Sequence, residues 1–205
     1  MFVFLLFLFL LTLCAATETT ASLLSVTDTL SHDRSAGFHK SSTSPGIITT
    51  VAGVNYVFSG SATDGVAATS KKISSPQGVA FDKDGNFYIA ASGDHKIFKV
   101  TASSGIITSA AGTGVKGYGG DGGQATSAML YEPMGVTLDT TGDIYIADTL
   151  NYRIRKITMS TGLITTVAGD GKQYDTKDNI AATSTSLNDP TDVAVDPSGN
   201  MFIAD

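Results

Sequence analysis

The stretch PMGVTLD at residues 133–139 occurs in three related forms along the chain. A related sequence, PQGVAFD, precedes it at 76–82, and another, PTDVAVD, follows it at 190–196, so the two intervals are equal. Similarity at a fixed period predicts a repeat architecture, in which each unit packs on its neighbours. Repeat scaffolds commonly present binding surfaces, so any chemistry has to be argued from individual residues.

Each unit contains several short apolar runs separated by polar turns. In the second unit these runs are 135–139, 144–148, 153–158 and 162–169. Runs of β-branched and aromatic residues bounded by Gly, Asn, Asp and Pro are typical of strands and hairpins. Four strands a unit predict a four-stranded antiparallel meander. Because a lone meander cannot bury both faces, the units must stack, and we expect an all-β propeller with the first strand of each unit nearest the axis.

Three segments give the chain a more specific resemblance. They are VAG at 167–169, GYGGDGGQAT at 117–126, and GDIYIAD at 142–148 followed by NYRIRK at 151–156. These segments resemble the NHL-repeat family, especially its extracellular type with a glycine-rich insertion between blades. The resemblance covers residues 46–205 and implies a partial NHL-type propeller of about two complete blades plus partial ones. The units lie near 76–112 and 133–169, with an incomplete unit at 190–205.

The N-terminus predicts a secretory signal peptide. Residues 1–13 are apolar except for Thr12, and small residues with a plausible cleavage point after Ala16 follow them. The apolar run is too short for a membrane-spanning helix, which needs roughly 20 residues. No Lys or Arg precedes it, so an uncleaved anchor or a misassigned start is the alternative. A lipoprotein site at Cys14 is disfavoured by the bulky Leu13. We therefore predict a secreted chain with residues 1–16 removed.

Residues 17–45 differ from the repeats, because nearly half of this segment is Ser or Thr and no apolar period is visible. Such a segment buries too little apolar surface to offset the entropy of ordering it. We expect a flexible leader, which is either O-glycosylated or simply a poorly ordered terminus. The only cysteine is Cys14, so the mature chain would form no disulfide, and it contains no Asn-x-Ser/Thr sequon.

The net charge of −6 disfavours nucleic acid as a partner, because an acidic protein repels the phosphate backbone. The most basic stretch, RIRK at 153–156, lies inside a predicted strand.

One acidic position recurs in the insertions, at Asp64, Asp121 and Asp178, with the same period as the units themselves. Carboxylates could hold a hard cation such as calcium, but each loop offers only one or two of them. We instead expect Asp121 to cap a short helical segment at 124–130. The stretch DKDGN at 82–86 superficially resembles a calcium loop. An EF-hand requires glycine at its sixth position and glutamate at its twelfth, and here those positions are Phe87 and Gly93, so we expect a hairpin turn. We predict no metal or cofactor site.

Asp148 and Arg153 flank a short predicted turn, and we expect them to form an ion pair across the hairpin, with a ligand-contacting Arg153 as the alternative. The corresponding residues of the first unit are Ala91 and Lys96. Differences of this kind, including Phe98 in the position of Arg155, are expected to distinguish the blades where a partner contacts them.

Catalysis by this chain is not expected. Some related propellers are metal-dependent lyases or lactonases, which hold their metal through histidines or acidic residues. Here the only histidine of the repeats is His95, the only glutamate is Glu132, and no nucleophile motif is present. The glycine stretch at 117–123 lacks the Gly-Lys-Ser/Thr that a P-loop requires. No catalytic, cofactor-binding or metal-binding residue is predicted.

The strand count falls short of a closed ring. The expected strands are one at 46–53, four at 76–112, four at 133–169 and two at 190–205, whereas a propeller has about four to eight blades. We expect a fragment of a longer propeller protein. The alternatives are closure by self-association through the open blade edges, or an open array.

The predicted function is a secreted protein-binding or glycan-binding adhesion module that makes its contacts through loops. The alternatives are part of a secreted propeller enzyme, a metal-dependent lyase or hydrolase with catalytic residues beyond the C-terminus, and a structural spacer.

Overall fold

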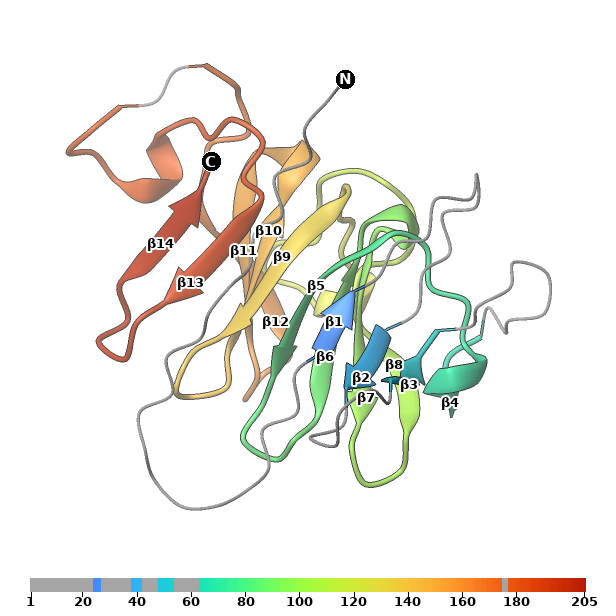
Figure 1. The fold of residues 1–205 in the computed structure, drawn as a ribbon. Coiled ribbons are helices and arrows are strands. Elements are labelled where there is room, and N and C mark those ends of the chain that lie inside the picture. The colour runs from blue at the N-terminus through green and yellow to red at the C-terminus, as the bar shows by residue number, and fades with distance from the viewer. Residues whose placement is uncertain (1–23, 27–37, 42–47, 54–62, 175–176) are drawn as a thin grey trace, which may run out of the picture.

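The structure, a computed structural model, describes residues 24–26, 38–41, 48–53, 63–174 and 177–205. The predicted signal peptide, residues 1–16, lies outside the described residues. The described chain consists of strands joined by turns and five short 3₁₀ segments, and it contains no helix long and apolar enough to cross a membrane. Figure 1 shows the strands as sheets that stand side by side, each tilted relative to the next.

Two sheets correspond to the two complete units that the sequence predicts. The first contains β5 (Pro76–Phe81), β6 (Phe87–Ala91), β7 (Lys96–Thr101) and β8 (Ile106–Ala111). The second contains β9 (Pro133–Leu138), β10 (Ile144–Asp148), β11 (Arg153–Thr158) and β12 (Leu163–Ala168). Both are antiparallel meanders with the strands in sequence order. The prediction of all-β, four-stranded blades is confirmed.

The remaining strands form partial blades. At the C-terminal side, β13 (Asp192–Val195) pairs with β14 (Met201–Ala204). At the N-terminal side, β3 (Ile48–Ala52) pairs with β2 (Phe38–Ser41), which pairs with β1 (Leu24–Val26). The strands β1 and β2 lie in the segment 17–45, for which no regular structure was expected. A two-residue strand, β4 (Val66–Ala67), adds to the outer edge of β8 and was also not predicted.

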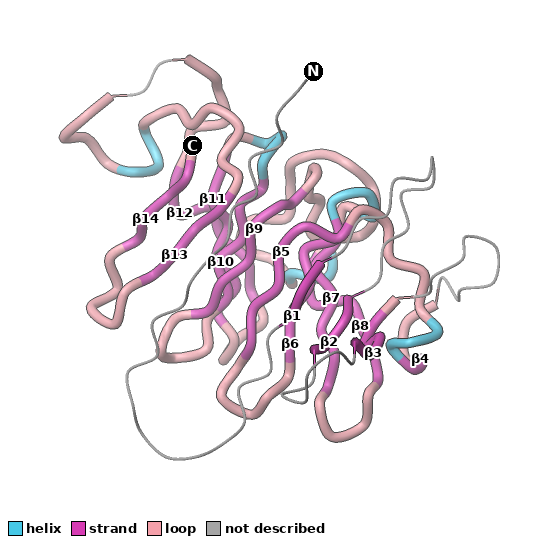
Figure 2. Tube along the Cα trace, viewed as in Figure 1, coloured by secondary structure: helices cyan, strands magenta, loops and turns pink. Residues whose placement is uncertain are grey.

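The first strands of successive units lie next to one another, as β5 does to β9 and β9 to β13. This arrangement places them on the inside of the blade array, as expected for a propeller, and Figure 2 shows the same succession. Apolar side chains from the facing sheets fill the space between blades. Tyr88 and Ala90 of one blade pack with Val136, Ile144 and Ile146 of the next. Since each blade buries its face on a neighbour, the core is divided among the blade interfaces.

The three turns of the DKDGN type are hairpin turns, as predicted. In the first, Asp82 Oδ1 accepts hydrogen bonds from the backbone N–H groups of Asp84 and Asn86. Asp139 and Asp196 make the corresponding contacts in the next two units. The carboxylates are therefore occupied by their own turns.

Candidate functional site

An insertion connects each blade to the next, and the glycine-rich one lies along the outer edge of the blade that follows it. This first insertion, residues 113–132, leads from β8 to β9. Its Gly122 N–H donates to the carbonyl of Ile164 on β12 at 2.8 Å, and the Ile164 N–H donates to the carbonyl of Gly123 at 3.0 Å. The insertion thus extends the sheet of the blade that follows it, as β4 does on β8. The second insertion, residues 170–189, connects β12 to β13.

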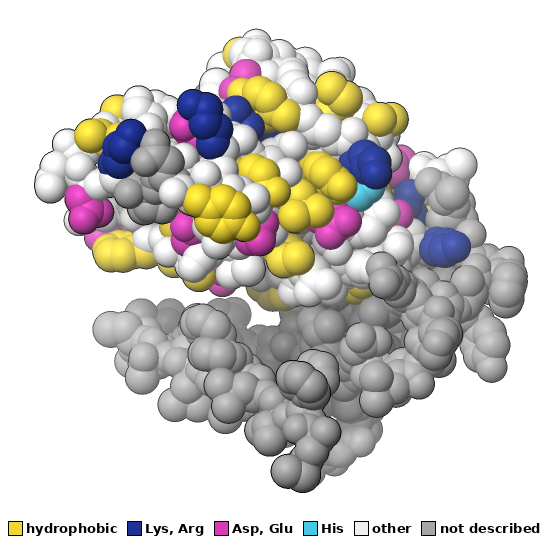
Figure 3. Space-filling view, turned by 90° about the horizontal axis from the view of Figure 1, so that it is seen from above, with side chains coloured by type: hydrophobic (Ala, Val, Ile, Leu, Met, Phe, Trp, Pro, Cys, Tyr) yellow, Lys and Arg dark blue, Asp and Glu magenta, His cyan; other side chains and the backbone are white. Residues whose placement is uncertain are grey.

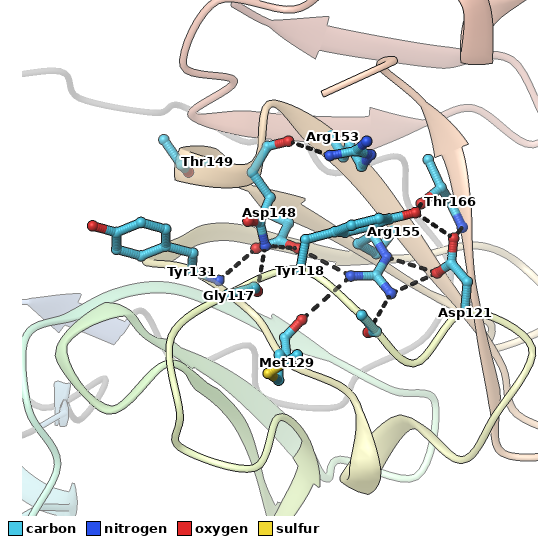
Figure 4. Close-up of polar contacts among 12 residues, drawn as sticks. Gly117, Tyr118, Asp121, Met129, Tyr131, Asp148, Thr149, Arg153, Arg155 and Thr166 are labelled. Atoms are coloured by element: carbon cyan, nitrogen blue, oxygen red, sulfur yellow. Dashed lines mark hydrogen bonds and ion pairs between the residues drawn. The ribbon is translucent and has the colours of Figure 1, made fainter. Parts of the chain in front are cut away.

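Asp121 fixes the first insertion to β12 and β11. Its carboxylate accepts hydrogen bonds from the backbone N–H of Thr166 at 3.1 Å and from the Tyr118 hydroxyl at 3.0 Å. It also forms an ion pair with Arg155 at 2.5 Å (Figure 4). Together these contacts hold the pKa of Asp121 below its usual value, against the opposing effect of burial. Asp121 is a latch between the insertion and the blade that follows it.

The prediction that Asp121 caps a helix is wrong. The segment 124–130 forms only a single 3₁₀ turn, η3 (Ala125–Ser127), and no side chain caps it. The recurring acidic position nevertheless has a recurring role. One period earlier, Asp64 accepts a hydrogen bond from the backbone N–H of Ser109 at 2.8 Å, and both acids reach a residue 45 positions ahead. The third member, Asp178, is exposed.

A buried charge cluster lies beneath this latch. Arg155 and Asp148 have fully buried side chains, and Arg155 Nη1 is 3.1 Å from Asp148 Oδ2. Asp148 also accepts hydrogen bonds from Asn151 Nδ2 and from the backbone N–H of Tyr131, both at 2.8 Å. A charge this deep must be paired and hydrogen-bonded, because leaving it alone costs several kcal/mol. Arg155 therefore joins two carboxylates, one from its own hairpin and Asp121 from the insertion.

The predicted ion pair between Asp148 and Arg153 does not form. The two residues are opposite each other in the register of β10 and β11, as expected. The Arg153 guanidinium instead donates to the carbonyls of Asn151 and Asp170, at 2.9 and 2.8 Å. It also lies 3.8 Å from the centre of the Tyr118 ring. The partner of Asp148 is Arg155, a position that the sequence marks only as one that differs between units.

The preceding blade builds the same cluster from other positions. Phe98 occupies the position of Arg155, and the cation is supplied by Lys71, which is the counterpart of Ala128 one period earlier. Lys71 Nζ lies 3.1 Å from Asp64 Oδ1 and 4.8 Å from the centre of the Phe98 ring. The buried cation of this blade therefore comes from the insertion (Lys71), whereas that of the next blade comes from strand β11 (Arg155). In both blades it pairs with the recurring aspartate of the insertion, Asp64 or Asp121.

The second acid has moved as well. Ala91 stands in the position of Asp148, and Asp94 stands in the position of Asn151. Asp94 Oδ2 accepts the backbone N–H of Ser74 at 2.8 Å, which is the bond that Asp148 makes to Tyr131. Burial raises the pKa of Asp94. In the third unit Asp205 makes this bond again, to the backbone N–H of Asn188.

The residues that differ between the two blades therefore compensate for one another, since each blade keeps a buried cation and a second acid at different positions. Arg155 is 0 % exposed and Phe98 is 2 % exposed. The expectation that a partner contacts the blades at these positions is wrong, because neither side chain reaches the surface. The sequence does contain a trace of this compensation, because four equivalent positions differ together between the two units. They are Lys71 and Ala128, Ala91 and Asp148, Asp94 and Asn151, and Phe98 and Arg155. The joint change can be interpreted only when these positions are known to be neighbours in space.

The buried cluster predicts a particular pH dependence. Burial raises the pKa of Asp148 to about 6, against the lowering effects of the Tyr131 and Asn151 hydrogen bonds and of Arg155. In the unfolded chain Asp148 should have the ordinary aspartate pKa of about 3.8. The folded state therefore holds this proton more tightly, so the contribution of Asp148 to stability is fully present below about pH 4 and is lost as the pH rises through about 6.

We expect the Asp148→Asn variant not to lose this part of its stability as the pH rises, because asparagine does not titrate. The measurement is the free energy of unfolding of both proteins by denaturant between about pH 4 and pH 7. The difference between wild type and variant removes the contributions of Asp64, Asp121 and Asp139, whose pKa values are lowered and which act in the opposite direction. A difference that stays constant over this range would contradict the assignment.

His95 and Glu132, the rare residues of the repeats, are engaged in structural contacts. The Glu132 backbone N–H donates to His95 Nδ1 at 3.2 Å, and the His95 ring packs edge-on against Tyr131. Both residues have a left-handed backbone, with φ of 53° for His95 and 48° for Glu132. Within the described part of the chain, no group of three or more His, Cys, Asp or Glu side chains could hold a metal ion.

The insertions carry exposed apolar side chains on one end of the molecule. Of the seven large hydrophobic residues exposed in the described segments, four lie in the two insertions: Val115, Tyr118, Tyr174 and Ile180. Both insertions leave an outer strand and return to an inner one, so they begin and finish at the same end of their blades, which is uppermost in Figure 1. Figure 3 looks onto this end and shows hydrophobic side chains gathered there, with Lys, Arg, Asp and Glu interspersed among them. We call this the insertion face.

Comparisons with known proteins agree with this architecture. A family model described as the Teneurin NHL domain matches residues 114–205. Among curated proteins, the chain is 37 % identical over 92 residues to Teneurin-1 of Gallus gallus, covering 42 % of this chain and 3 % of that protein. It is 38 % identical over 99 residues to NHL repeat-containing protein 2 of Gallus gallus, covering 48 % and 13 %. It is 35 % identical over 99 residues to the chloroplastic protein SUPPRESSOR OF QUENCHING 1 of Arabidopsis thaliana, covering 48 % and 9 %. The chain thus matches only a small part of each of these relatives.

Solved structures share the fold over most of the chain. A protein of unknown function from Bacteroides thetaiotaomicron superimposes with a TM-score of 0.63 and 23 % identity, covering 84 % of this chain and 40 % of that one. A chain of the nidogen/laminin complex superimposes with a TM-score of 0.51 and 17 % identity, covering 83 % and 49 %. At these identities the likeness concerns the fold alone. The family model and the NHL-repeat relatives therefore support an NHL-repeat domain over about residues 114–205, and the solved structures show a shared β-propeller fold.

Proposed function

We propose that this protein is a secreted recognition or adhesion module, which binds a protein or glycan partner through the insertion face and carries out no catalysis itself. The observation that carries the proposal is the exposure of Val115, Tyr118, Tyr174 and Ile180, which are 62 %, 43 %, 80 % and 44 % exposed. Exposed apolar groups gathered among polar ones are typical of interaction sites, and tyrosine is enriched in protein interfaces.

The construction of the insertions supports this assignment. Asp121 and the β12 backbone hold the first insertion, so its apolar side chains are presented from a fixed support. Tyr118 lies against the Arg153 guanidinium, at 3.8 Å, and its hydroxyl donates to Asp121. A side chain held in this way loses little conformational entropy when a partner binds it. A structure of the same fold is part of a complex between nidogen and laminin, which is a precedent for protein binding on this scaffold.

The proposal predicts that binding depends on the exposed apolar side chains of the insertions. The variant combines Val115→Ser, Tyr174→Ser and Ile180→Ser, all at exposed positions, so we expect little change in stability. Binding of the purified chain to immobilised extracellular matrix extract is measured by biosensor, before and after treatment of the extract with protease or with glycosidases. We expect the triple variant to lose at least 10-fold in affinity, about 1.4 kcal/mol.

Phe81→Ser is the matched control, because Phe81 is 49 % exposed and precedes the turn at the opposite end of its blade. The treatment that abolishes binding identifies the partner as protein or glycan. Equal binding by wild type and the triple variant would overturn the assignment to the insertion face. Secretion is tested separately, by detecting the chain without residues 1–16 in the culture medium. Self-association through the open blade edges stays a prediction.

A further inference from the structure

A cavity of about 190 Å³ lies between the two complete blades. Its walls come from β6, β7 and β8 of one blade, from β10 and β11 of the next, and from the insertion that joins them, including η3. Met159 and Gly162 also contribute to the lining, and the turn that contains them, between β11 and β12, is at the opposite end of the blade from the insertion face. The cavity is therefore separate from the surface to which partner binding is assigned.

The interior of the cavity is apolar. Tyr88, Ile144, Ile157 and Ala125 line it, and each is at most 3 % exposed. Ligand sites for drug-sized molecules are typically about 300–1,000 Å³. A cavity of this size accommodates a single apolar group, such as a branched aliphatic chain or one aromatic ring. Hydroxyl and amide groups of Thr108, Thr126 and Gln124 contribute the polar part of the lining.

The wall also carries a lysine that differs from its counterpart in the next blade. Lys99 lies with its Nζ 5.4 Å from the centre of the Tyr88 ring, and Lys156 lies in the same way 5.0 Å from Tyr145. Lys156 forms ion pairs with Asp143 at 2.9 Å and with Asp139 at 3.7 Å. For Lys99, no carboxylate among the described residues lies within ion-pair distance.

The turn sequence explains this difference. Asn86 replaces Asp143 in the first blade, which removes one acid. The other acid, Asp82, is engaged by Asn86, whose side-chain amide donates to Asp82 Oδ2 at 2.8 Å. Lys99 therefore places an ammonium group beside an apolar cavity. The carboxylate of a ligand could pair with it, as Asp143 pairs with Lys156 in the next blade.

We propose that this cavity binds a short carboxylic acid, the apolar body of which fills the space between the blades while its carboxylate pairs with Lys99. The same chemistry is found in a free short-chain acid and in the C-terminal residue of a polypeptide that ends in leucine. A ligand of about eight heavy atoms with one ion pair should bind with a Kd on the order of 1 mM.

The probe is 4-methylpentanoate, and its neutral amide, 4-methylpentanamide, is the comparison. Both are titrated into the purified, isotopically labelled chain and followed by NMR. We expect saturable shifts confined to the cavity, at Ala110, Ala125, Ile144 and Ile157, with at least fivefold weaker binding of the amide. Lys99→Gln should reduce the affinity for the acid to that of the amide. Lys156→Gln, the change at the corresponding lysine, should leave it unaltered.

Several outcomes would overturn the proposal: no saturable shift, shifts scattered over the surface, equal binding of acid and amide, or wild-type affinity in Lys99→Gln. A second titration compares N-acetyl-glycyl-leucine, which has a free carboxylate, with the short acid. Either ligand supports the site by binding there. Tighter binding of the peptide identifies a polypeptide C-terminus as the source, and tighter binding of the short acid identifies a small molecule.

Discussion

Replacing Gly78 with alanine is expected to destabilise the protein by about 3 kcal/mol, although the change adds a single methyl group. A Cβ at this position would lie 2.6 Å from the carbonyl oxygen of Met134 and 3.3 Å from the backbone nitrogen of Val136. These atoms belong to β9, the inner strand of the next blade, so the two inner strands approach too closely for any side chain. Relief requires the blades to move apart, which would open the apolar core between them. Denaturant unfolding measures the loss.

The next blade repeats this contact, because a Cβ on Gly135 would lie 2.7 Å from Cα of Asp192 and 2.9 Å from the carbonyl oxygen of Thr191. Gly135→Ala should therefore have a similar effect. Gly142→Asn is the control. Gly142 has a left-handed backbone with φ of 88° and open space around it, a conformation that asparagine tolerates well, so we expect a loss below about 1 kcal/mol. Equal losses at Gly78 and Gly142 would show that the contact between blades is unimportant.

Replacing Arg155 with phenylalanine is expected to cost about 3–5 kcal/mol, because it leaves the buried Asp148 without its cation. The preceding blade nevertheless contains Phe98 at this position and folds around it. Its compensating residues can be transferred to the second blade. Together with Arg155→Phe, the changes are Asp148→Ala, Asn151→Asp and Ala128→Lys, which supply the acid and the cation from the positions that Asp94 and Lys71 occupy.

We expect the fourfold variant to regain at least half of the stability that Arg155→Phe loses, as measured by denaturant unfolding. The Arg155→Phe, Asp148→Ala double variant serves as the matched intermediate, since it removes the unpaired acid without rebuilding the cluster. The two arrangements are interchangeable solutions only if the fourfold variant is more stable than this intermediate. If it is equally stable or less stable, the positions depend on other features of their own blades.

The strands of the complete units were predictable because their signals are local. Alternating β-branched and aromatic residues, bounded by turns, mark β10 and β11 to the residue, and the constant period marks their counterparts. The strands that were missed, β1, β2 and β4, lack these signals. Each is short, and β1 and β2 lie in a segment rich in Ser and Thr. They are strands because they pair with a neighbouring strand, and their own residues do not predict that pairing.

The period also marked Asp64 and Asp121 as a recurring position, but it could not supply their role. Asp121 contacts the backbone of Thr166, far along the chain, and that contact exists only because the insertion lies along the outer edge of the following blade. For the same reason Asp148 was assigned to Arg153, its neighbour across the hairpin, when its partner is Arg155. The strand register shows that Asp148 and Arg153 are opposite each other, but the buried charge of Asp148 is paired with Arg155, which is buried beside it.

The sequence by itself therefore determined the repeat, the blade type and the NHL relationship, because strand alternation and turn residues act over a few positions. Tertiary structure alone decided what the insertions do, where the buried charges pair and why the inner strands carry glycine. Those features arise between successive blades, from atoms that are distant along the chain and come within contact distance only when the blades stack.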